Sequence, residues 1–329
     1  MTRGLVARGH RVTVLEIREG GHFRADVLAA GGEVVSAAVR HRADVFGVVR
    51  RLRALRADVA YGLNPEANVL ALIGGAPAVF GVRGTRLDLS PKDALARVAM
   101  RLQHRLAGRA RLVVANSESA AAELRARGYR AQWVRVVFNG LDAASFARDP
   151  NRRAEWRARL GIANDEQLIG TAARMDRQKD AATFLRAAAR AQRPGRRFAW
   201  FGDGPLRAEI AQLARSLDVD LLLPGAVGDM RAVYSVLDVF TLSSAWGEGF
   251  SNAFAEALAA GLPCVVTNSG DHVRAREVAT VVAPGDPDAL ATGWDRVVAA
   301  GGPGWVRAHM DVDQMVSRTE AVLLEARGR

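Results

Sequence analysis

Residues 246–263 read WGEGFSNAFAEALAAGLP, and this stretch decides the fold of the C-terminal half of the chain. It comes shortly after the apolar, β-branched run LDVFTL, which is typical of a strand. Glu248 lies between two glycines, which allow the backbone to turn sharply and to approach a ligand closely. Ser251 or Asn252 then caps a helix that runs to Gly261, since glycine commonly follows a helix end. The stretch therefore predicts a strand, a glycine-rich turn and a capped helix, in that order.

The start of this helix is suited to an anion, because its free backbone N–H groups and the positive end of its dipole face the turn. Glu256 lies just past the first helical turn. Helical side chains lean toward the N-terminus, so its carboxylate points back at the same ligand. Two acids beside a phosphate-binding helix end favour a ligand with both phosphate and hydroxyl groups, such as a nucleotide sugar. The alternative interpretation is a solvated loop glutamate beside an ordinary amphipathic helix.

Length and composition indicate a two-domain globular protein. The 329 residues exceed what one ordinary core requires and suit two domains of about 150 residues each. Cys264 is the single cysteine, so no internal disulfide is possible and a reducing cytoplasm is expected. No apolar run approaches the ~20 residues of a membrane helix, and the basic start leads into a charged helix rather than a signal peptide.

The net charge of +11 is concentrated in the N-terminal half. Residues 1–150 hold 24 Lys and Arg against 13 Asp and Glu, whereas residues 151–329 hold 22 of each. A basic half favours an anionic partner: a membrane surface, nucleic acid or an acidic acceptor. Of these we expect peripheral contact with an anionic membrane, at the inner face of the plasma membrane, and no nucleic acid. Arginine drift in a GC-rich genome is the alternative, since only two of the 46 basic residues are lysine.

One expected helix, at 91–108, combines basic and apolar residues. Arg97, Arg101 and Arg105 follow one another at i,i+4 spacing, and another face carries Leu95, Val98, Ala99, Leu102 and Leu106. A basic amphipathic helix can lie on an anionic membrane. The alternative is a helix that packs its apolar face on its own sheet and leaves its charges in solvent.

Short apolar runs alternate with helical stretches along the whole chain, which predicts βαβ units and parallel, doubly wound sheets. Strands are expected near 12–17, 33–36, 58–62, 77–82, 111–116, 133–138, 168–172, 198–202, 221–224, 237–242, 264–267 and 280–283. Helices are expected near 2–9, 23–31, 44–56, 64–74, 90–108, 117–128, 181–193, 205–216, 229–236, 252–260, 286–299 and 312–326.

This alternation predicts an α/β protein with two Rossmann-like domains that face a central cleft. The N-terminal, acceptor-side domain covers 1–145, and the C-terminal, nucleotide-sugar-binding domain covers 146–311. A turn-rich linker is expected at 139–151, where Pro150 closes a run of turn residues. Ligands of such folds bind outside the carboxyl ends of the parallel strands.

Glu248 and Glu256 also match the E-x7-E signature of retaining GT-B glycosyltransferases, and the surrounding GEGFSNAFAEALAAGLPCV resembles family 4 of that group. The segments around Asn116-Ser117 and Asn139-Gly140 are similar to further motifs of the same family. The resemblance implies that Glu248 contacts the donor sugar and that Glu256 binds the nucleotide ribose. It also implies that the last helix, 312–329, crosses back to the first domain.

The loop after the expected strand at 168–172 contains Arg174 and Lys179, which match the family's R-x-x-x-x-K pattern. The resemblance implies that these two cations neutralise the donor diphosphate. Such charges stabilise the negative charge that builds on a departing nucleoside diphosphate. The alternative is a pair of solvated loop charges. The turn Gly202-Asp203-Gly204-Pro205 also matches the family, although a tight strand-to-helix turn explains it equally well.

The resemblance extends to other residues of both domains. The donor site is expected to include Arg174, Lys179, Val227, Glu248, Gly249, Phe250, Ser251 and Glu256, with Val227 close to the base. Many relatives place a histidine on a loop of the first domain, but the loops 61–66 and 81–86 of this chain contain none. Arg83 or Asn64 is therefore expected to hydrogen-bond a sugar on the acceptor side. The histidines have no metal-ligand spacing, so neither a metal nor another cofactor is expected.

The expected function is retaining transfer of a sugar from a nucleoside diphosphate to a hydroxyl of a glycan or lipid-linked acceptor. Front-face attack would let the departing phosphate accept the proton of the acceptor, so no dedicated base is required. The alternatives are a GT-B nucleotide-sugar epimerase and a non-catalytic nucleotide-sugar-binding protein.

Family members place a strand and a glycine-rich turn before the first helix, and this chain begins within that helix. We therefore expect the first strand of the N-terminal domain to be missing, two neighbouring strands to show unpaired edges, and a longer natural form to exist.

Overall fold

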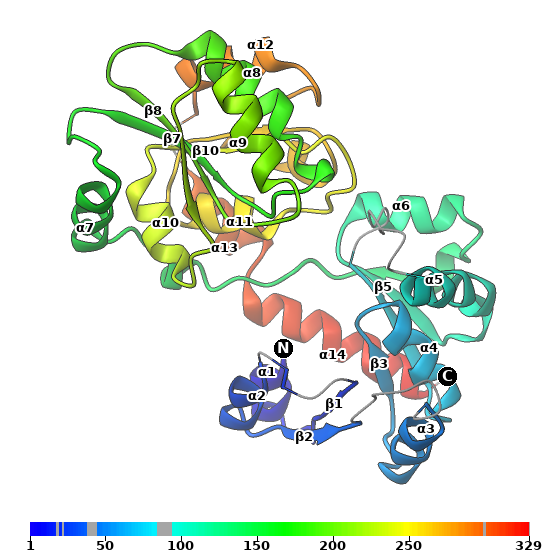
Figure 1. The fold of residues 1–329 in the computed structure, drawn as a ribbon. Coiled ribbons are helices and arrows are strands. Elements are labelled where there is room, and N and C mark those ends of the chain that lie inside the picture. Colours follow the sequence, from blue (N-terminus) through cyan, green and yellow to red (C-terminus); the bar gives the residue numbers. More distant parts are fainter. Residues whose placement is uncertain (18–19, 22, 38–44, 84–93, 299–300, 329) are drawn as a thin grey trace. The chain divides into compact units, whose positions relative to one another are not determined.

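The structure, a computed structural model, describes residues 1–17, 20–21, 23–37, 45–83, 94–298 and 301–328. It consists of two compact units (Figure 1). The first unit contains Met1–Gly140 together with Val312–Arg329, and the second contains Leu141–Asp311. The predicted α/β class with parallel sheets is confirmed.

The second unit is built around a six-stranded parallel sheet with the order β12-β11-β10-β7-β8-β9. Its strands are β7 (Gln167–Ala172), β8 (Arg196–Phe201), β9 (Leu221–Gly225), β10 (Val239–Leu242), β11 (Cys264–Thr267) and β12 (Thr280–Val282). The chain starts in the middle with β7, proceeds to one edge and then returns to the other side of β7 with β10. The strand order therefore reverses between β7 and β10, which is the point where ligands of doubly wound sheets bind.

Helices cover both faces of this sheet, and most positions of its strands are accordingly apolar. They are α7 (Pro150–Leu160), α8 (Ala181–Ala191), α9 (Arg207–Ser216), α10 (Met230–Val236), α11 (Asn252–Ala259), α12 (Pro287–Asp295) and α13 (Gly302–His309). Within β8, Phe198 and Trp200 join the core under α8, α9 and α12, whereas Ala199 and Phe201 join the core under α10, α11 and α13. This alternation fixes the register of β8 between two buried layers.

Two helices of the second unit are absent from the sequence prediction. The expected linker ends at Asn151, but α7 begins at Pro150, where the Asp149 side chain accepts hydrogen bonds from the amides of Asn151 (3.0 Å) and Arg152 (3.3 Å). The helix packs only Trp156 and Leu160 against the core, and its one fully buried residue is Arg157, so its apolar pattern is weak. The second helix, α13, contains two glycines and a proline, which are poor helix formers.

The first unit contains two parallel sheets among its described residues. Strand β1 (Thr13–Glu16) pairs with β2 (Glu33–Ser36), and a four-stranded sheet has the order β3 (Ala60–Gly62), β4 (Ala78–Val82), β5 (Leu112–Ala115) and β6 (Val134–Val136). A Rossmann-like domain as predicted would hold these six strands in one doubly wound sheet, whereas the structure divides them between two.

Seven helices surround the strands of this unit in the described part of the chain: α1 (Thr2–Ala7), α2 (Arg24–Ala29), α3 (Val45–Ala54), α4 (Pro65–Ile73), α5 (Ala94–Leu106), α6 (Glu118–Ala126) and α14 (Val312–Gly328). The apolar face of α14 packs on the four-stranded sheet, where Val322 and Ala326 join the core of Val79 and Leu112. Helix α1 lies so close to α14 that a Cβ on Gly4 would come within 2.5 Å of the Val316 side chain. These contacts attach the last helix to the first unit.

Candidate functional site

Two turns at the carboxyl ends of β7 and β10 are joined at the reversal point of the second sheet. The turn after β7 ends in the short 3-10 helix Arg177–Lys179, and the turn after β10 begins at Ser243. The Ser243 hydroxyl donates to the carbonyl oxygens of Lys179 (2.8 Å) and Asp180 (3.1 Å). The Ala245 amide donates to the Gln178 carbonyl (2.8 Å). The two turns therefore form one rigid platform.

Lys179 and Glu248 form an ion pair on this platform. The two side chains are 16% and 9% exposed, so the pair is largely withdrawn from water but remains reachable. The Ser244 hydroxyl donates a second hydrogen bond to Glu248 Oε1 at 2.7 Å. Burial by itself raises the pKa of Glu248, but the charge of Lys179 and the hydrogen bonds from Lys179 and Ser244 bring the pKa below its usual value. Glu248 is therefore ionised at neutral pH.

The loop that carries Arg174 is supported by the glycine turn after β8. The Met175 amide donates to the Asp203 carbonyl (2.9 Å). A Cβ on Gly202, whose φ is +126°, would lie 2.2 Å from the Ala173 oxygen, and a Cβ on Gly204 would lie 2.5 Å from the Met175 oxygen. The glycines therefore allow two backbones to touch, and this turn supports the loop.

Arg174 itself lies apart from the ion pair. Its side chain is 72% exposed and its nearest ionic partner is Asp176, at 4.0 Å. The structure thus brings Lys179 and Glu248 together, whereas Arg174 extends into solvent from the same loop.

Helix α11 begins where the sequence predicts it. Ser251 is its N-cap residue, although the serine side chain makes no capping hydrogen bond. Gly247 has a φ of +75° and Gly261 has a φ of +73°, so both glycines occupy the left-handed conformation that their positions require. The helix places Glu256 beside Tyr234 of α10, whose hydroxyl donates to Glu256 Oε2 at 2.7 Å. Burial raises the pKa of Glu256, so the two glutamates have pKa values shifted in opposite directions.

The remaining predicted donor residues are embedded in the core around α11. Phe250 stacks on Phe254 and Trp305 with ring centroids 5.1 and 5.2 Å apart. The Gly249 carbonyl accepts a hydrogen bond from the Asp271 amide (2.9 Å). Val227 lies half-buried against the same core, in the loop between β9 and α10.

His272, which no sequence pattern singles out as a site residue, lies fully buried next to this site. Its Nδ1 is 2.8 Å from the Thr267 carbonyl, and its Nε2 is 3.3 Å from the Ser251 amide. An isolated histidine without metal-ligand spacing gives no signal of its own. The available signal is its position after β11, at the sheet edge that also carries Lys179 and Glu248.

In the first unit, Asn64 and Arg83 line one cavity of about 140 Å³. Arg83 follows β4 and donates to the Asn139 side chain (3.1 Å), while the Asn64 side-chain oxygen caps α4 by accepting from the Ala67 amide (2.8 Å). Residues 84–86 of the same loop lie outside the described residues. The other lining residues are Leu63, Pro65, Gly81, Val82, Met100, Gln103, His104, Glu123, Leu124 and Arg127.

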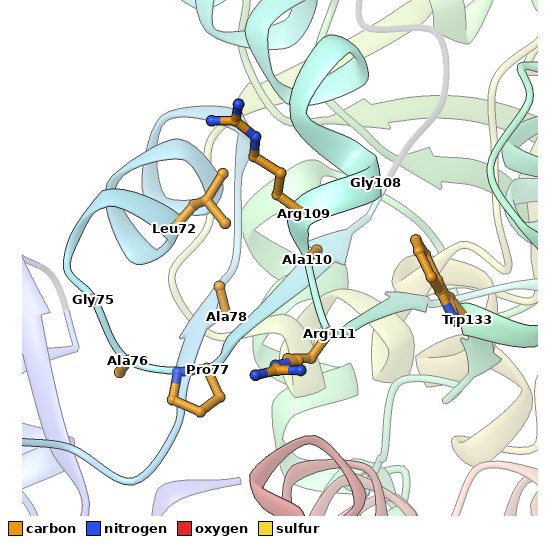
Figure 2. A pocket seen from close by; sticks show the side chains of 10 residues that line it. All are labelled: Leu72, Gly75, Ala76, Pro77, Ala78, Gly108, Arg109, Ala110, Arg111 and Trp133. Atoms are coloured by element: carbon orange, nitrogen blue, oxygen red, sulfur yellow. The ribbon is translucent and has the colours of Figure 1, made fainter. Parts of the chain in front are cut away.

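A larger hollow of about 510 Å³ lies at the opposite edge of the four-stranded sheet, where β4, β5 and β6 begin. Figure 2 shows the side chains of Arg109, Arg111 and Trp133 among those that line it, with Pro77 beside Arg111. Because ligands of parallel α/β sheets bind at the carboxyl ends of the strands, we do not assign this hollow to the nucleotide sugar.

Two further properties bear on the ligand and the surface. Within the described ranges, no cluster of three or more His, Cys, Asp or Glu residues could hold a metal ion. None of the helices in the described ranges has the length and apolarity to cross a bilayer.

Two family models match the chain in succession. The model for Glycosyltransferase Family 4 matches residues 1–145, and the model for Glycosyl transferases group 1 matches residues 166–300. The second match spans β7 to β12 and therefore contains Lys179, Glu248 and Glu256.

Curated relatives agree with these matches over part of their length. EpsF of Bacillus subtilis, which bears a glycosyltransferase name, is 36% identical over 140 residues, 41% of this chain and 36% of its own. The UDP-Gal:alpha-D-GlcNAc-diphosphoundecaprenol alpha-1,3-galactosyltransferase of Escherichia coli is 32% identical over 142 residues. This alignment also covers 41% of this chain and 36% of the relative. The alignments thus span only about a third of these two relatives.

Solved structures are similar over almost the whole chain. The Anabaena protein HepE, solved in complex with UDP and glucose, has a TM-score of 0.82 at 21% identity and covers 98% of this chain and 95% of its own. Sucrose-phosphate synthase of Thermosynechococcus elongatus has a TM-score of 0.76 at 18% identity, and the match covers 97% of this chain and 90% of the synthase. At these identities the likeness establishes the fold, which is GT-B.

Proposed function

Because the chain belongs to the GT-B glycosyltransferases, with a Glycosyltransferase Family 4 part followed by a Glycosyl transferases group 1 part, we propose that it transfers a sugar from a nucleoside-diphosphate sugar to a hydroxyl of a glycan or lipid-linked acceptor. We further propose that the transfer retains the configuration of the sugar. The names of two relatives support this class of donor: that of the Escherichia coli relative contains UDP-Gal, and that of a mannosyltransferase of Mycolicibacterium smegmatis contains GDP-mannose.

One observation carries the proposal: a buried, ionised Lys179–Glu248 pair lies at the reversal point of the second sheet. A lysine there supplies positive charge for a diphosphate, and a glutamate supplies oxygens that accept hydrogen bonds from sugar hydroxyls. The two charges neutralise each other, so the pair can be held at a largely buried position and still present both groups to a ligand that has both chemistries.

The departing diphosphate gains negative charge as the bond between sugar and phosphate breaks. Lys179 is held in place by the platform to meet that charge, and Arg174 can reach it from the supported loop. Glu248 holds the sugar and Glu256 the ribose. In front-face attack the acceptor proton passes to the departing phosphate, so the site needs no separate base, and we expect transfer without an added divalent metal ion.

We assign the acceptor side to the cavity that Asn64 and Arg83 line in the first unit. The Asn64 side-chain oxygen already accepts from the Ala67 amide, so Asn64 can offer only its NH2 donors, whereas Arg83 offers several donors together with a positive charge for an acceptor hydroxyl or phosphate. The diphosphate-linked lipid in the name of the Escherichia coli relative supports a lipid-linked acceptor.

The first unit also presents a surface suited to an anionic membrane. On α5, Arg97, Arg101 and Arg105 are exposed, and Val98 (49% exposed) and Leu102 (39%) lie exposed beside them. The sequence predicts an apolar face apart from the arginines, but of its residues only Ala99 is buried. The side chain of Leu95, which belongs to the same predicted face, lies outside the described residues. Exposed apolar residues among arginines support peripheral contact with an anionic membrane.

A thermal-shift screen tests the donor class. UDP, GDP, ADP, CDP and dTDP at about 1 mM are compared with the matching nucleoside monophosphates. A ligand at about 100 times its Kd adds roughly 2.7 kcal/mol of stability, enough to raise Tm by several degrees. We expect at least one diphosphate to raise Tm more than its monophosphate. If no diphosphate changes Tm, the proposed donor site is wrong.

A further inference from the structure

His272 is buried beside the donor site and makes two hydrogen bonds that only one form of its ring allows. The Thr267 carbonyl can only accept, so Nδ1 carries the hydrogen and donates to it at 2.8 Å. The Ser251 amide can only donate, so Nε2 must present its lone pair at 3.3 Å. A protonated ring would place an N–H of Nε2 against the N–H of Ser251. The arrangement therefore requires the neutral ring with hydrogen on Nδ1.

Aromatic packing prevents the ring from turning to another arrangement. Phe250 and Phe254 meet its plane nearly edge-on, at interplanar angles of 87° and 78° and centroid distances of 5.9 and 5.3 Å. Phe250 is held in turn by Trp305, whose ring lies 5.2 Å away at 18°. With no exposed surface, His272 has no room to flip and no water to replace the Ser251 amide.

The Ser251 amide is an informative partner because Ser251 is the N-cap of α11 and its side chain makes no capping bond. What directs the start of the helix is instead the bond to His272, together with the bond from the Asp271 amide to the Gly249 carbonyl (2.9 Å). The N–H groups of the next turn, which a helix leaves without intrahelical partners, are the ones that can bind a phosphate. Their direction depends on where the turn at Gly249–Ser251 is held.

We propose that neutral His272 is a positioning residue for the donor: it holds the Gly249–Ser251 turn and thereby aims the first amides of α11 at the diphosphate. This inference rests on the proposed nucleotide-sugar function. His272 itself touches neither sugar nor phosphate, and it acts through the Ser251 amide.

The charged groups near the ring are compatible with a neutral form at physiological pH. Burial lowers the pKa of His272, and the charge of Lys179 lowers it further; the Thr267 carbonyl and the charges of Glu248 and Asp271 raise it, and the net direction is downward. A pKa below the ordinary value keeps the folded ring neutral while an unfolded histidine gains a proton. The free energy of unfolding therefore begins to fall as pH drops below about 6.5, and it continues to fall until the folded ring is itself protonated.

Two substitutions separate the two hydrogen bonds. In His272→Gln the amide oxygen can take the place of Nε2 and accept from Ser251, whereas in His272→Asn the amide nitrogen can take the place of Nδ1 and donate to Thr267. Neither side chain titrates. Affinity for UDP and GDP, whichever binds wild type, is measured by calorimetry at pH 7.5 and pH 5.5, with circular dichroism as a check of folding.

We expect His272→Gln to bind within about threefold of wild type at pH 7.5 and His272→Asn to bind about tenfold more weakly. Between pH 7.5 and 5.5, the free energy of unfolding, measured by urea titration, should fall more for wild type than for His272→Gln, because only the wild-type chain gains a proton at this position when it unfolds. The inference is overturned if folded Gln and Asn variants bind equally well, or if the free energies of unfolding of wild type and His272→Gln show the same pH dependence. The second comparison stands even if the Asn variant does not fold. If the wild-type protein binds no nucleoside diphosphate, the proposed function itself is contradicted. If wild type binds and both variants bind equally well, only the role of His272 is contradicted.

Discussion

At the scale of single residues, the Lys179–Glu248 pair makes a testable claim about charge. Lys179→Ala removes a charge-assisted contact and leaves Glu248 buried without its cation. We expect binding of the nucleoside diphosphate to weaken roughly 10- to 100-fold, corresponding to about 1.5–3 kcal/mol. Arg177→Ala is the matched control, since Arg177 is an exposed cation of the same turn. If calorimetry finds equal affinities for the Lys179 variant and wild type, the proposal that Lys179 binds the diphosphate is wrong.

Substitutions of the two glutamates should affect binding and turnover differently, because the two side chains hold different parts of the donor. Glu256→Gln should weaken binding of both the free diphosphate and the nucleotide sugar, since both contain the ribose. Glu248→Gln should leave the affinity for free diphosphate nearly unchanged and lower turnover. Because burial raises the pKa of Glu256 and Lys179 helps to lower that of Glu248, falling pH should protonate Glu256 first. Equal losses of diphosphate affinity in both variants would show that this division of roles is wrong.

At the scale of elements, the glycine turn after β8 supports the Arg174 loop by contact between backbones. A Cβ at Gly202 would meet the Ala173 oxygen at 2.2 Å, and φ is +126°. We expect Gly202→Ala to reduce the free energy of unfolding by about 2–4 kcal/mol in urea titrations. Gly195→Ala is the control, since Gly195 also has positive φ (+76°) but nothing within 4 Å of its Cβ, so it should cost only about 1–2 kcal/mol. Similar losses for both variants would rule out the clash.

The elements also show what the sequence can and cannot predict. Strands such as β7 and β11 are predictable because both faces are buried, which makes most of their positions apolar. Helix α7 is less predictable, because much of its attachment is ionic: Arg153 and Arg157 bind Asp238, which directly precedes β10, at 2.6 and 3.2 Å. Glu248 and Lys179 are recognisable from spacing and resemblance. His272 is not, because its partners are backbone groups that only the folded chain brings together.

At the scale of the whole molecule, the basic excess of residues 1–150 gives a prediction for membranes. Binding to vesicles with anionic lipid should exceed binding to neutral vesicles and should fall with added salt. Replacing Arg97, Arg101 and Arg105 by Glu should abolish the preference, as measured by vesicle co-sedimentation. Exchanging Arg186, Arg190 and Arg215 of the second unit for Glu is the matched control and should leave it nearly unchanged. A wild type that binds both vesicle types equally would leave the charge without this role.

The account as a whole claims that the chain transfers sugar from a nucleoside diphosphate to an acceptor hydroxyl. The most direct measurement is nucleoside diphosphate release from UDP-galactose, UDP-glucose and GDP-mannose, with and without a lipid that carries GlcNAc on a diphosphate. We predict release that requires the acceptor, yields a product with the anomeric configuration of the donor, and falls sharply in Glu248→Gln. Release that is equally fast without acceptor, or an inverted product, or full activity in the Glu248 variant would contradict the account.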